Sequence, residues 1–203
     1  MKPERIGLFG GSFNPVHLGH QAIVEASLNY LDRVIIMPCR ISPHKLDQVN
    51  ASEMVTTEHR LNMLKACFDE NERVEISRWE MDRESISYSW MTLEMLKEAN
   101  LQAEIVLVMG WDQFIALPTW HRFEDWGREQ KYLVFKRAGE GSMAETPEPL
   151  ADLDVEFASE ELPDLSATQV RTKLSKGDQN AKNSLAAEVW NYLHEHELYG
   201  IES

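Results

Sequence analysis

Two histidines three residues apart follow the first apolar stretch of the chain. The segment LFGGSFNPVHLGH, residues 8–20, places His17 and His20 beside two glycines, a serine and an Asn-Pro pair. Residues at i and i+3 share one face of a helix, so both imidazoles can point toward one ligand. Glycines allow close backbone approach and positive φ, and a helix N-terminus favours phosphate. The segment therefore predicts a phosphate site.

Three other interpretations of this segment have less support. The chain contains neither a G-x-x-x-x-G-K-[ST] loop nor a G-x-G-x-x-G fingerprint. Two histidines can also bind a metal, but no nearby cysteine and no matching His–Glu pair completes a zinc shell. A strand-to-helix turn with an incidental histidine pair is the plainest alternative, and the full string after a strand favours the functional interpretation over it.

The histidines need elements that hold them at one edge of a sheet. Apolar runs predict strands at residues 5–10, 33–38, 73–79, 103–109 and 131–136, and helical periodicity predicts helices at 17–30, 58–70 and 88–100. This alternation predicts an α/β fold with a Rossmann-like parallel sheet and helices on both faces. Ligands of such sheets bind beyond the carboxyl ends of the strands. We therefore expect GGSFNPVHLGH, PCRISPHK and GWDQF, which each follow a strand, to line one crevice.

The remainder of the chain predicts a lobe added to the same domain. We expect one domain over residues 1–203, with its α/β core at about 1–137. Residues 138–164 are acidic and proline-rich, which predicts an exposed loop with one extra strand at 155–158. Residues 165–203 predict a small helical lobe, in which Ser166 caps a first helix and 183–198 form a last one.

Composition limits the partners. The net charge of −14 argues against nucleic acid and anionic membranes as partners. The chain has no apolar run of the roughly 18 residues that a membrane span requires, and its N-terminus lacks the apolar core of a signal peptide. Cys39 and Cys67 show neither a disulfide framework nor metal spacing. We expect a cytoplasmic protein with reduced thiols, and the sequence leaves its oligomeric state open.

Several motifs carry a family resemblance. GGSFNPVHLGH resembles the nucleotidyltransferase superfamily marked by H-x-G-H, and later segments narrow the resemblance to bacterial nicotinate-nucleotide adenylyltransferases. PCRISPHK is similar to that family's P-x-x-x-P-P-H-K, and LSATQVR to its I-S-[SA]-T-x-[IV]-R. Three further family motifs have counterparts in this chain. E-x-x-R-x-x-x-S-Y-T-x-x-T-L is matched at Glu80, Arg83, Ser87, Tyr88, Ser89, Thr92 and Leu93. G-x-D is matched at Gly110 and Asp112, and L-x-x-W at the segment that ends in Trp120. The matches run nearly end to end, in the family's order.

The resemblance implies a reaction and a set of site residues. ATP and nicotinate mononucleotide would give deamido-NAD and pyrophosphate in NAD biosynthesis, with Mg²⁺ accompanying ATP rather than held by protein ligands. Catalytic roles fall on His17, His20, Lys45 and Arg171. ATP binding falls on Gly10, Gly11, Ser12, Phe13, Gly19, Gly110, Asp112, Ser166 and Thr168. Mononucleotide binding falls on Asn14, His44, Arg83, Ser87, Tyr88, Ser89 and Trp120.

Some residues depart from the family's usual pattern, namely Asn14, Cys39, Arg40, Ser42, Ser89, Trp111 and His121. Several flank the expected mononucleotide pocket. The alternatives are therefore a related adenylyltransferase that prefers nicotinamide mononucleotide or another phosphorylated acceptor, or a nucleotide-binding protein without catalysis. In so acidic a chain, we also expect a local positive pocket made by His17, His20, Arg40, His44, Lys45, Arg171 and Lys173.

Overall fold

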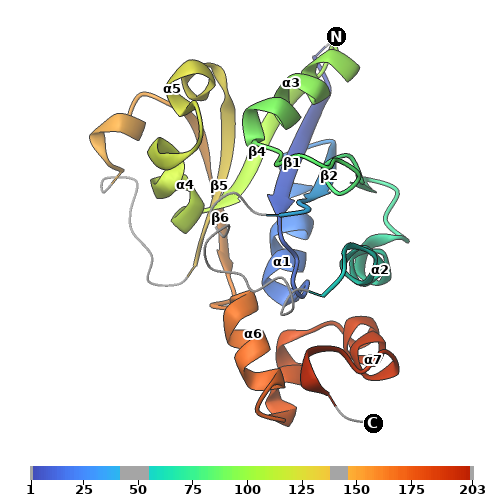
Figure 1. The fold of residues 1–203 in the computed structure, drawn as a ribbon. Helices are drawn as coiled ribbons and strands as arrows, with labels where there is room; N and C mark the ends of the chain where they lie inside the picture. Colours follow the sequence, from blue (N-terminus) through green and yellow to red (C-terminus); the bar gives the residue numbers. More distant parts are fainter. Residues whose placement is uncertain (1, 42–54, 138–145, 202–203) are drawn as a thin grey trace.

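Six parallel strands form one sheet in the order β3-β2-β1-β4-β5-β6 (Figure 1). The computed structural model describes residues 2–41, 55–137 and 146–201. The strands are β1 (Arg5–Gly11), β2 (Arg33–Pro38), β3 (Val74–Ile76), β4 (Glu104–Gly110), β5 (Lys131–Arg137) and β6 (Asp154–Leu162). From β1 the chain adds β2 and β3 on one side of the sheet, and from β4 it adds β5 and β6 on the other side. A crevice is therefore expected where β1 and β4 end.

Helices cover both faces of the sheet. They are α1 (Leu18–Ser27), α2 (Thr57–Phe68), α3 (Ser89–Ala99), α4 (Trp111–Ala116), α5 (Phe123–Trp126), α6 (Ala167–Leu174) and α7 (Ala187–Glu195). Buried side chains of α1 and α2 belong to one hydrophobic cluster, and those of α3, α4 and α5 belong to another on the opposite face. Each face therefore has its own core, with the sheet between them.

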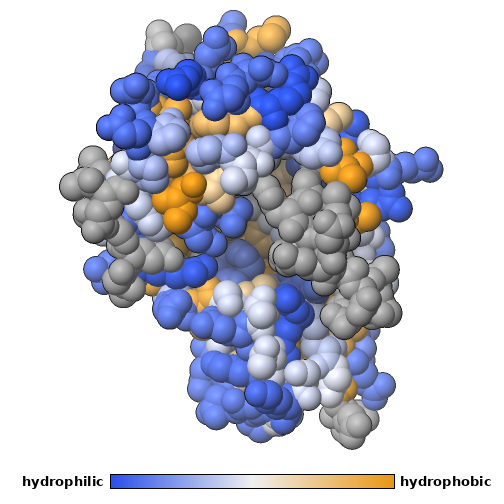
Figure 2. Space-filling model, turned by 60° about the vertical axis from the view of Figure 1, so that its left-hand side comes forward, coloured by the Kyte–Doolittle hydropathy of each residue, from blue (hydrophilic) through white to orange (hydrophobic). Residues whose placement is uncertain are grey.

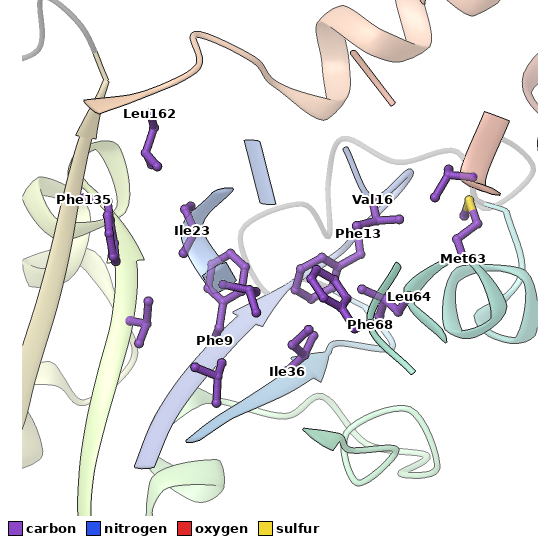
Figure 3. Close-up of a cluster of buried hydrophobic side chains, with 14 of the residues drawn as sticks. Phe9, Phe13, Val16, Ile23, Ile36, Met63, Leu64, Phe68, Phe135 and Leu162 are labelled. Carbon is purple, nitrogen blue, oxygen red and sulfur yellow. The ribbon is translucent and has the colours of Figure 1, made fainter. Parts of the chain in front are cut away.

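Strand β1 contributes to both cores. Ile6 and Leu8 belong to the cluster with α3, whereas Phe9 points to the cluster with α1 and α2. Figure 3 shows Phe9, Phe13 and Phe68 in one cluster, and the Phe9 and Phe13 rings meet edge to face at 5.5 Å. Burial on both faces explains why the central strands read as continuous apolar runs rather than as alternating patterns.

The C-terminal lobe lies beyond the carboxyl ends of the strands, at the bottom of Figure 1. Its helices α6 and α7 flank a 3₁₀ segment, Gln179–Ser184, and α7 packs against α2. The buried side chains Val170, Leu174, Val189 and Leu193 join the core on the α2 face. The lobe therefore closes the end of the molecule where ligands of this fold bind, rather than lying flat on the sheet.

The structure confirms the predicted fold class and corrects some boundaries. β2 matches the predicted range, and the extra strand is present but longer, as β6. The predicted strand at 73–79 is shortened to Val74–Ile76, because the chain turns away where exposed Arg78 pairs with Glu58. The last helix begins at Ala187 instead of 183, because Leu185 is extended. Helices α4 and α5 were not predicted.

Candidate active site

A crevice of about 750 Å³ opens at the carboxyl ends of β1 and β4. Figure 2 shows the hollow between the larger body and the lobe below it. Gly11 at the end of β1, Cys39 after β2 and Asp112 after β4 all line it, which confirms that the strand-end segments converge as far as the described residues extend. Its volume lies in the range of roughly 300–1,000 Å³ that is typical of small-molecule sites.

The two motif histidines occupy the first turn of α1 and stack on each other, with ring centroids 3.7 Å apart. His17 is the N-cap residue, and its Nδ1 accepts a hydrogen bond from the Gly19 N–H at 3.1 Å. His20 Nδ1 accepts from the His17 N–H at 3.3 Å. Because each Nδ1 accepts, each neutral ring carries its hydrogen on Nε2. The His17 ring thus has an Nε2–H donor on the side away from the helix.

Close packing fixes the positions of these rings. A β-carbon at position 19 would lie 3.0 Å from the His17 ring, so glycine lets this ring fold against the helix. The Phe13 ring lies 5.0 Å from His20 and supports it from the core side. Positive φ occurs at Phe13, at 46°, and not at Gly10 or Gly11 as the sequence suggested. The loop is therefore strained at a buried aromatic residue.

Burial makes His17 a neutral donor. The residue is 5% exposed, and burial followed by the positive charge of Arg137 lowers the pKa of His17 from 6.5 to about 4. His17 is therefore uncharged at neutral pH, which corrects its expected contribution to a positive pocket. Arg137, at the end of β5, lines the crevice. Sequence reasoning missed it, although the predicted strand at 131–136 ends directly before it.

The segment after β4 directs one carboxylate into the crevice. Gly110 and Asp112 both line it, and a β-carbon on Gly110 would lie 2.9 Å from Asp112 Oδ1. Glycine therefore leaves room for the carboxylate to fold back over the strand end. Trp111 between them points into the core, with its ring 5.7 Å from Phe114. The large residue in this motif is thus accommodated without filling the crevice.

One end of the crevice is aromatic. Tyr88 and His121 stack with centroids 4.2 Å apart and planes 22° apart, and Trp120 and Trp126 lie beside each other at 6.4 Å. Ser87 is 7% exposed, and within the described chain its Oγ has no hydrogen-bond partner. Flat apolar surfaces with one unsatisfied hydroxyl suit a planar heterocycle that carries a polar substituent.

A buried carboxyl also lines the crevice. Glu80 is 8% exposed and accepts a hydrogen bond from Thr92 Oγ1 at 2.5 Å. Burial raises the pKa of Glu80 to about 7, although the Thr92 hydrogen bond and the charge of Arg83 act in the opposite direction. Glu80 therefore changes its charge near neutral pH.

The C-terminal lobe holds the loop that precedes the histidines. Arg171 Nη1 donates to the Asn14 carbonyl at 2.7 Å, and Tyr199 Oη donates to Asn14 Oδ1 at 2.5 Å. The uncharged amide oxygen of Asn14 thus accepts the hydrogen bond that the Tyr199 hydroxyl donates. Ser166 is the N-cap of α6, as predicted, and its Oγ accepts from the Gln169 N–H at 3.2 Å.

Most predicted site residues line this crevice: Gly10, Gly11, Ser12, His17, Gly19, His20, Ser87, Tyr88, Ser89, Gly110, Asp112, Trp120 and Ser166. Others lie around it without lining it: Phe13, Asn14, Arg83, Thr168 and Arg171. His44 and Lys45 lie outside the described residues. Arg83 packs over the Trp79 ring at 4.5 Å, and Thr168 Oγ1 accepts from Arg171 Nη2 at 3.3 Å.

The described chain contains no group of three or more His, Cys, Asp or Glu side chains placed to hold a metal ion. In the same residues, none of the helices is long and apolar enough to cross a membrane.

The strand order and the H-x-G-H turn at the start of α1 are those of an α/β nucleotidyltransferase. A sequence profile described as "Cytidylyltransferase-like" matches residues 8–173. A probable nicotinate-nucleotide adenylyltransferase of Enterococcus faecalis is 32% identical over 98% of this chain and 86% of its own. One of Pseudomonas aeruginosa is 32% identical over 97% of both. The chain belongs to the cytidylyltransferase-like family and, within it, to the nicotinate-nucleotide adenylyltransferases.

Solved structures share the fold. The nicotinic acid mononucleotide adenylyltransferase of Plasmodium falciparum, complexed with NaAD, superposes with a TM-score of 0.79 over 98% of both chains, at 17% identity. The same enzyme complexed with APC gives a TM-score of 0.77. At this identity the likeness establishes the fold alone.

Proposed function

We propose that the protein transfers the adenylyl group of ATP to nicotinate mononucleotide, in the cytoplasm, as a step of NAD biosynthesis. The observation that carries the proposal is the crevice itself, in which the histidine turn and the aromatic Tyr88 end share one hollow. A phosphate oxygen of the mononucleotide bonds to the α-phosphorus of ATP. The bond from this phosphorus to the bridging oxygen breaks, and pyrophosphate leaves with the electron pair. Deamido-NAD is the other product.

The ATP end stabilises charge rather than forming a covalent bond to the substrate. His17 presents its Nε2–H to the triphosphate while remaining neutral, and His20 stacks beside it. Lys45 and Arg171 neutralise the leaving pyrophosphate. Asp112 accepts from the ribose hydroxyls. The surrounding positions shape the pocket or add donors: Gly10, Gly11, Ser12, Phe13, Gly19, Gly110, Ser166 and Thr168.

The acceptor end orients the mononucleotide. Trp120 stacks on the pyridine ring, and the Ser87 hydroxyl and the backbone of Tyr88 and Ser89 face its substituent. Support comes from the unsatisfied Ser87 Oγ and the stacked Tyr88–His121 pair. The remaining contacts to the mononucleotide come from Asn14, His44 and Arg83.

Mg²⁺ enters as part of the ATP substrate. Magnesium usually keeps several waters and is bound through one or two carboxylates and substrate phosphates. The crevice fits a magnesium ion that arrives with ATP, because the described residues form no group of three or more metal-ligating side chains, and phosphate oxygens and water would supply the ligands. The ion neutralises charge on the phosphates. Placing the two substrates in line is then the work of this chain's own side chains.

A product assay tests the proposal. The protein is incubated with ATP and Mg²⁺, once with nicotinate mononucleotide and once with nicotinamide mononucleotide, and dinucleotide and pyrophosphate are quantified. His20→Ala is the active-site variant. His59→Ala is its matched control, because His59 lies outside the crevice, where its Nδ1 is 2.9 Å from Tyr192 Oη. Deamido-NAD that is lost only in His20→Ala supports the proposal, whereas ATP binding without any dinucleotide contradicts it.

A second candidate acceptor is nicotinamide mononucleotide, and Glu80 is the observation that favours it. An ionised carboxylate in the crevice repels the nicotinate carboxylate but accepts a hydrogen bond from an amide. The two acceptors are distinguished by the ratio of their kcat/KM values at pH 6 and pH 8. A preference for nicotinamide that grows with pH and disappears in Glu80→Gln identifies this acceptor.

A further inference from the structure

Arg60 on α2 is a nearly completely buried cation at the base of the crevice. The residue is 1% exposed. Its Nη1 donates to the carbonyls of Ser12 and Cys39, each at 2.7 Å, and its Nη2 donates to the carbonyl of Arg40 at 3.2 Å. One guanidinium thus joins the loop after β1 to the loop after β2. Ser12 and Cys39 line the crevice, whereas Arg60 lies behind them.

The charge of Arg60 has no carboxylate partner among the described residues, and its Nε makes no hydrogen bond there. Burial lowers the pKa of Arg60 below its usual value, although a guanidinium stays protonated in proteins. Burying an unpaired cation is costly, and a well-packed apolar side chain in the same volume often stabilises a fold more. Stability alone therefore does not explain why arginine occupies this position.

The hydrogen bonds from Arg60 fix the orientation of the peptide units in the two loops. The C=O and N–H of a planar trans peptide unit point in opposite directions. With the carbonyls of Ser12 and Cys39 turned to Arg60, the N–H groups of Phe13 and Arg40 point away from Arg60. The peptide units that carry these N–H groups begin at Ser12 and Cys39, which both line the crevice. Within the described chain, neither N–H donates to another backbone group. Backbone N–H groups that converge on one point can bind an anion, as the concavities formed by successive N–H groups do.

We propose that Arg60 is a positioning residue for substrate phosphates, which it serves by holding the carbonyls of both strand-end loops and so presenting their N–H groups to the crevice. It contacts no substrate. The tight packing of the loops supports this role: the Cys39 N–H donates to the Gly11 carbonyl at 2.9 Å, and Cys39 Sγ lies 3.7 Å from Ser12 Oγ. The inference rests on the proposed use of ATP.

Arg60→Lys tests the geometry separately from the charge. Lysine keeps the positive charge but lacks the planar fork that reaches three carbonyls. Arg73→Lys is the matched control, because Arg73 also donates to three backbone carbonyls, those of Asp32, Leu28 and Leu31, at the opposite end of the sheet. Thermal melting of both variants is measured first, and every assay is run well below the lower Tm.

The expected result is a loss of ATP affinity and a fall in kcat/KM for ATP of roughly 10²-fold in Arg60→Lys, as for other small misplacements of a binding site. Arg73→Lys is expected to lower Tm but to keep the wild-type ATP affinity and the wild-type kcat/KM for ATP. Wild-type kinetics in Arg60→Lys, or equal losses in the two variants, overturn the proposal. ATP binding is measured without any acceptor, so a wrong choice of acceptor leaves this test intact.

A measurement on the wild-type protein covers the case in which Arg60→Lys does not fold. Backbone ¹⁵N–¹H resonances are followed while ATP is added. The proposal expects the Phe13 and Arg40 amide signals to shift at the same ATP concentration as those of the His20 turn. Shifts at His20 that leave both amides unmoved overturn it.

Discussion

Replacing His17 by asparagine is expected to change how stability depends on pH. The pKa of His17 is 6.5 when unfolded and about 4 when folded, so between these values the unfolded chain binds a proton that the folded chain does not. The stability that neutral His17 contributes is present above pH 6.5 and is lost as the pH falls toward 4. At 1.36 kcal/mol per pH unit, the loss is ~3 kcal/mol. Asparagine can cap α1 through its side-chain oxygen but does not titrate.

Glu80 acts in the opposite direction in almost the same pH range. Its pKa is 4.5 when unfolded and about 7 when folded. Its contribution is fully present below pH 4.5 and is lost as the pH rises through 7, again by ~3 kcal/mol. In the wild-type protein the two effects largely offset each other between pH 4.5 and 6.5. Each variant is therefore expected to reveal the slope of the group that remains.

Urea unfolding at pH 4.5, 5.5, 6.5 and 7.5 measures both effects as differences from wild type, so that titrations common to all variants cancel. With rising pH, the free energy of unfolding of His17→Asn should fall relative to wild type. That of Glu80→Gln should rise. Curves for either variant that run parallel to wild type would refute the buried, neutral state assigned to that residue.

Three further variants test the site. Tyr199→Phe leaves Asn14 Oδ1 without its donor and should cost about 1–3 kcal/mol in thermal unfolding; an unchanged Tm contradicts the anchoring role. Gly19→Ala places a β-carbon 3.0 Å from the His17 ring and should lower kcat/KM by roughly 10²-fold without loss of helix content by circular dichroism. Trp120→Ala should raise KM for the mononucleotide about tenfold while ATP affinity is kept, and equal weakening of both substrates would remove Trp120 from the acceptor end.

The sequence was sufficient to predict the parts of the fold whose signal is local. β2 was placed correctly because a strand buried on both faces is apolar at every position. β6 was recognised only in part, since this edge strand carries exposed acidic residues that interrupt its apolar pattern. Helices α4 and α5 have six and four residues and were missed. Segments so short depend on tertiary contacts rather than on periodicity.

In the candidate site, too, features with a local sequence signal could be predicted, whereas features that depend on tertiary packing could not. The motif predicted that His17 belongs to the site, and His17 lines the crevice, but its role as a cap depends on backbone geometry, because histidine is not among the usual N-cap residues. Arg60 looks like an ordinary charged residue of an amphipathic helix, and its burial becomes visible only when α2 is packed against two loops. Neutrality of His17 also requires knowledge of its burial and of Arg137, which is distant in sequence.

The anchoring of Asn14 sets an order of events during protein synthesis. Tyr199 lies 185 residues after Asn14, and Arg171 lies 157 residues after it. A chain that leaves the ribosome from its N-terminus has the histidine turn and strands β1 to β5 before either anchor exists. The nascent protein thus carries the histidine turn next to a loop that is not yet held at Asn14. Both anchors of Asn14 are in place only after Tyr199 has been synthesised.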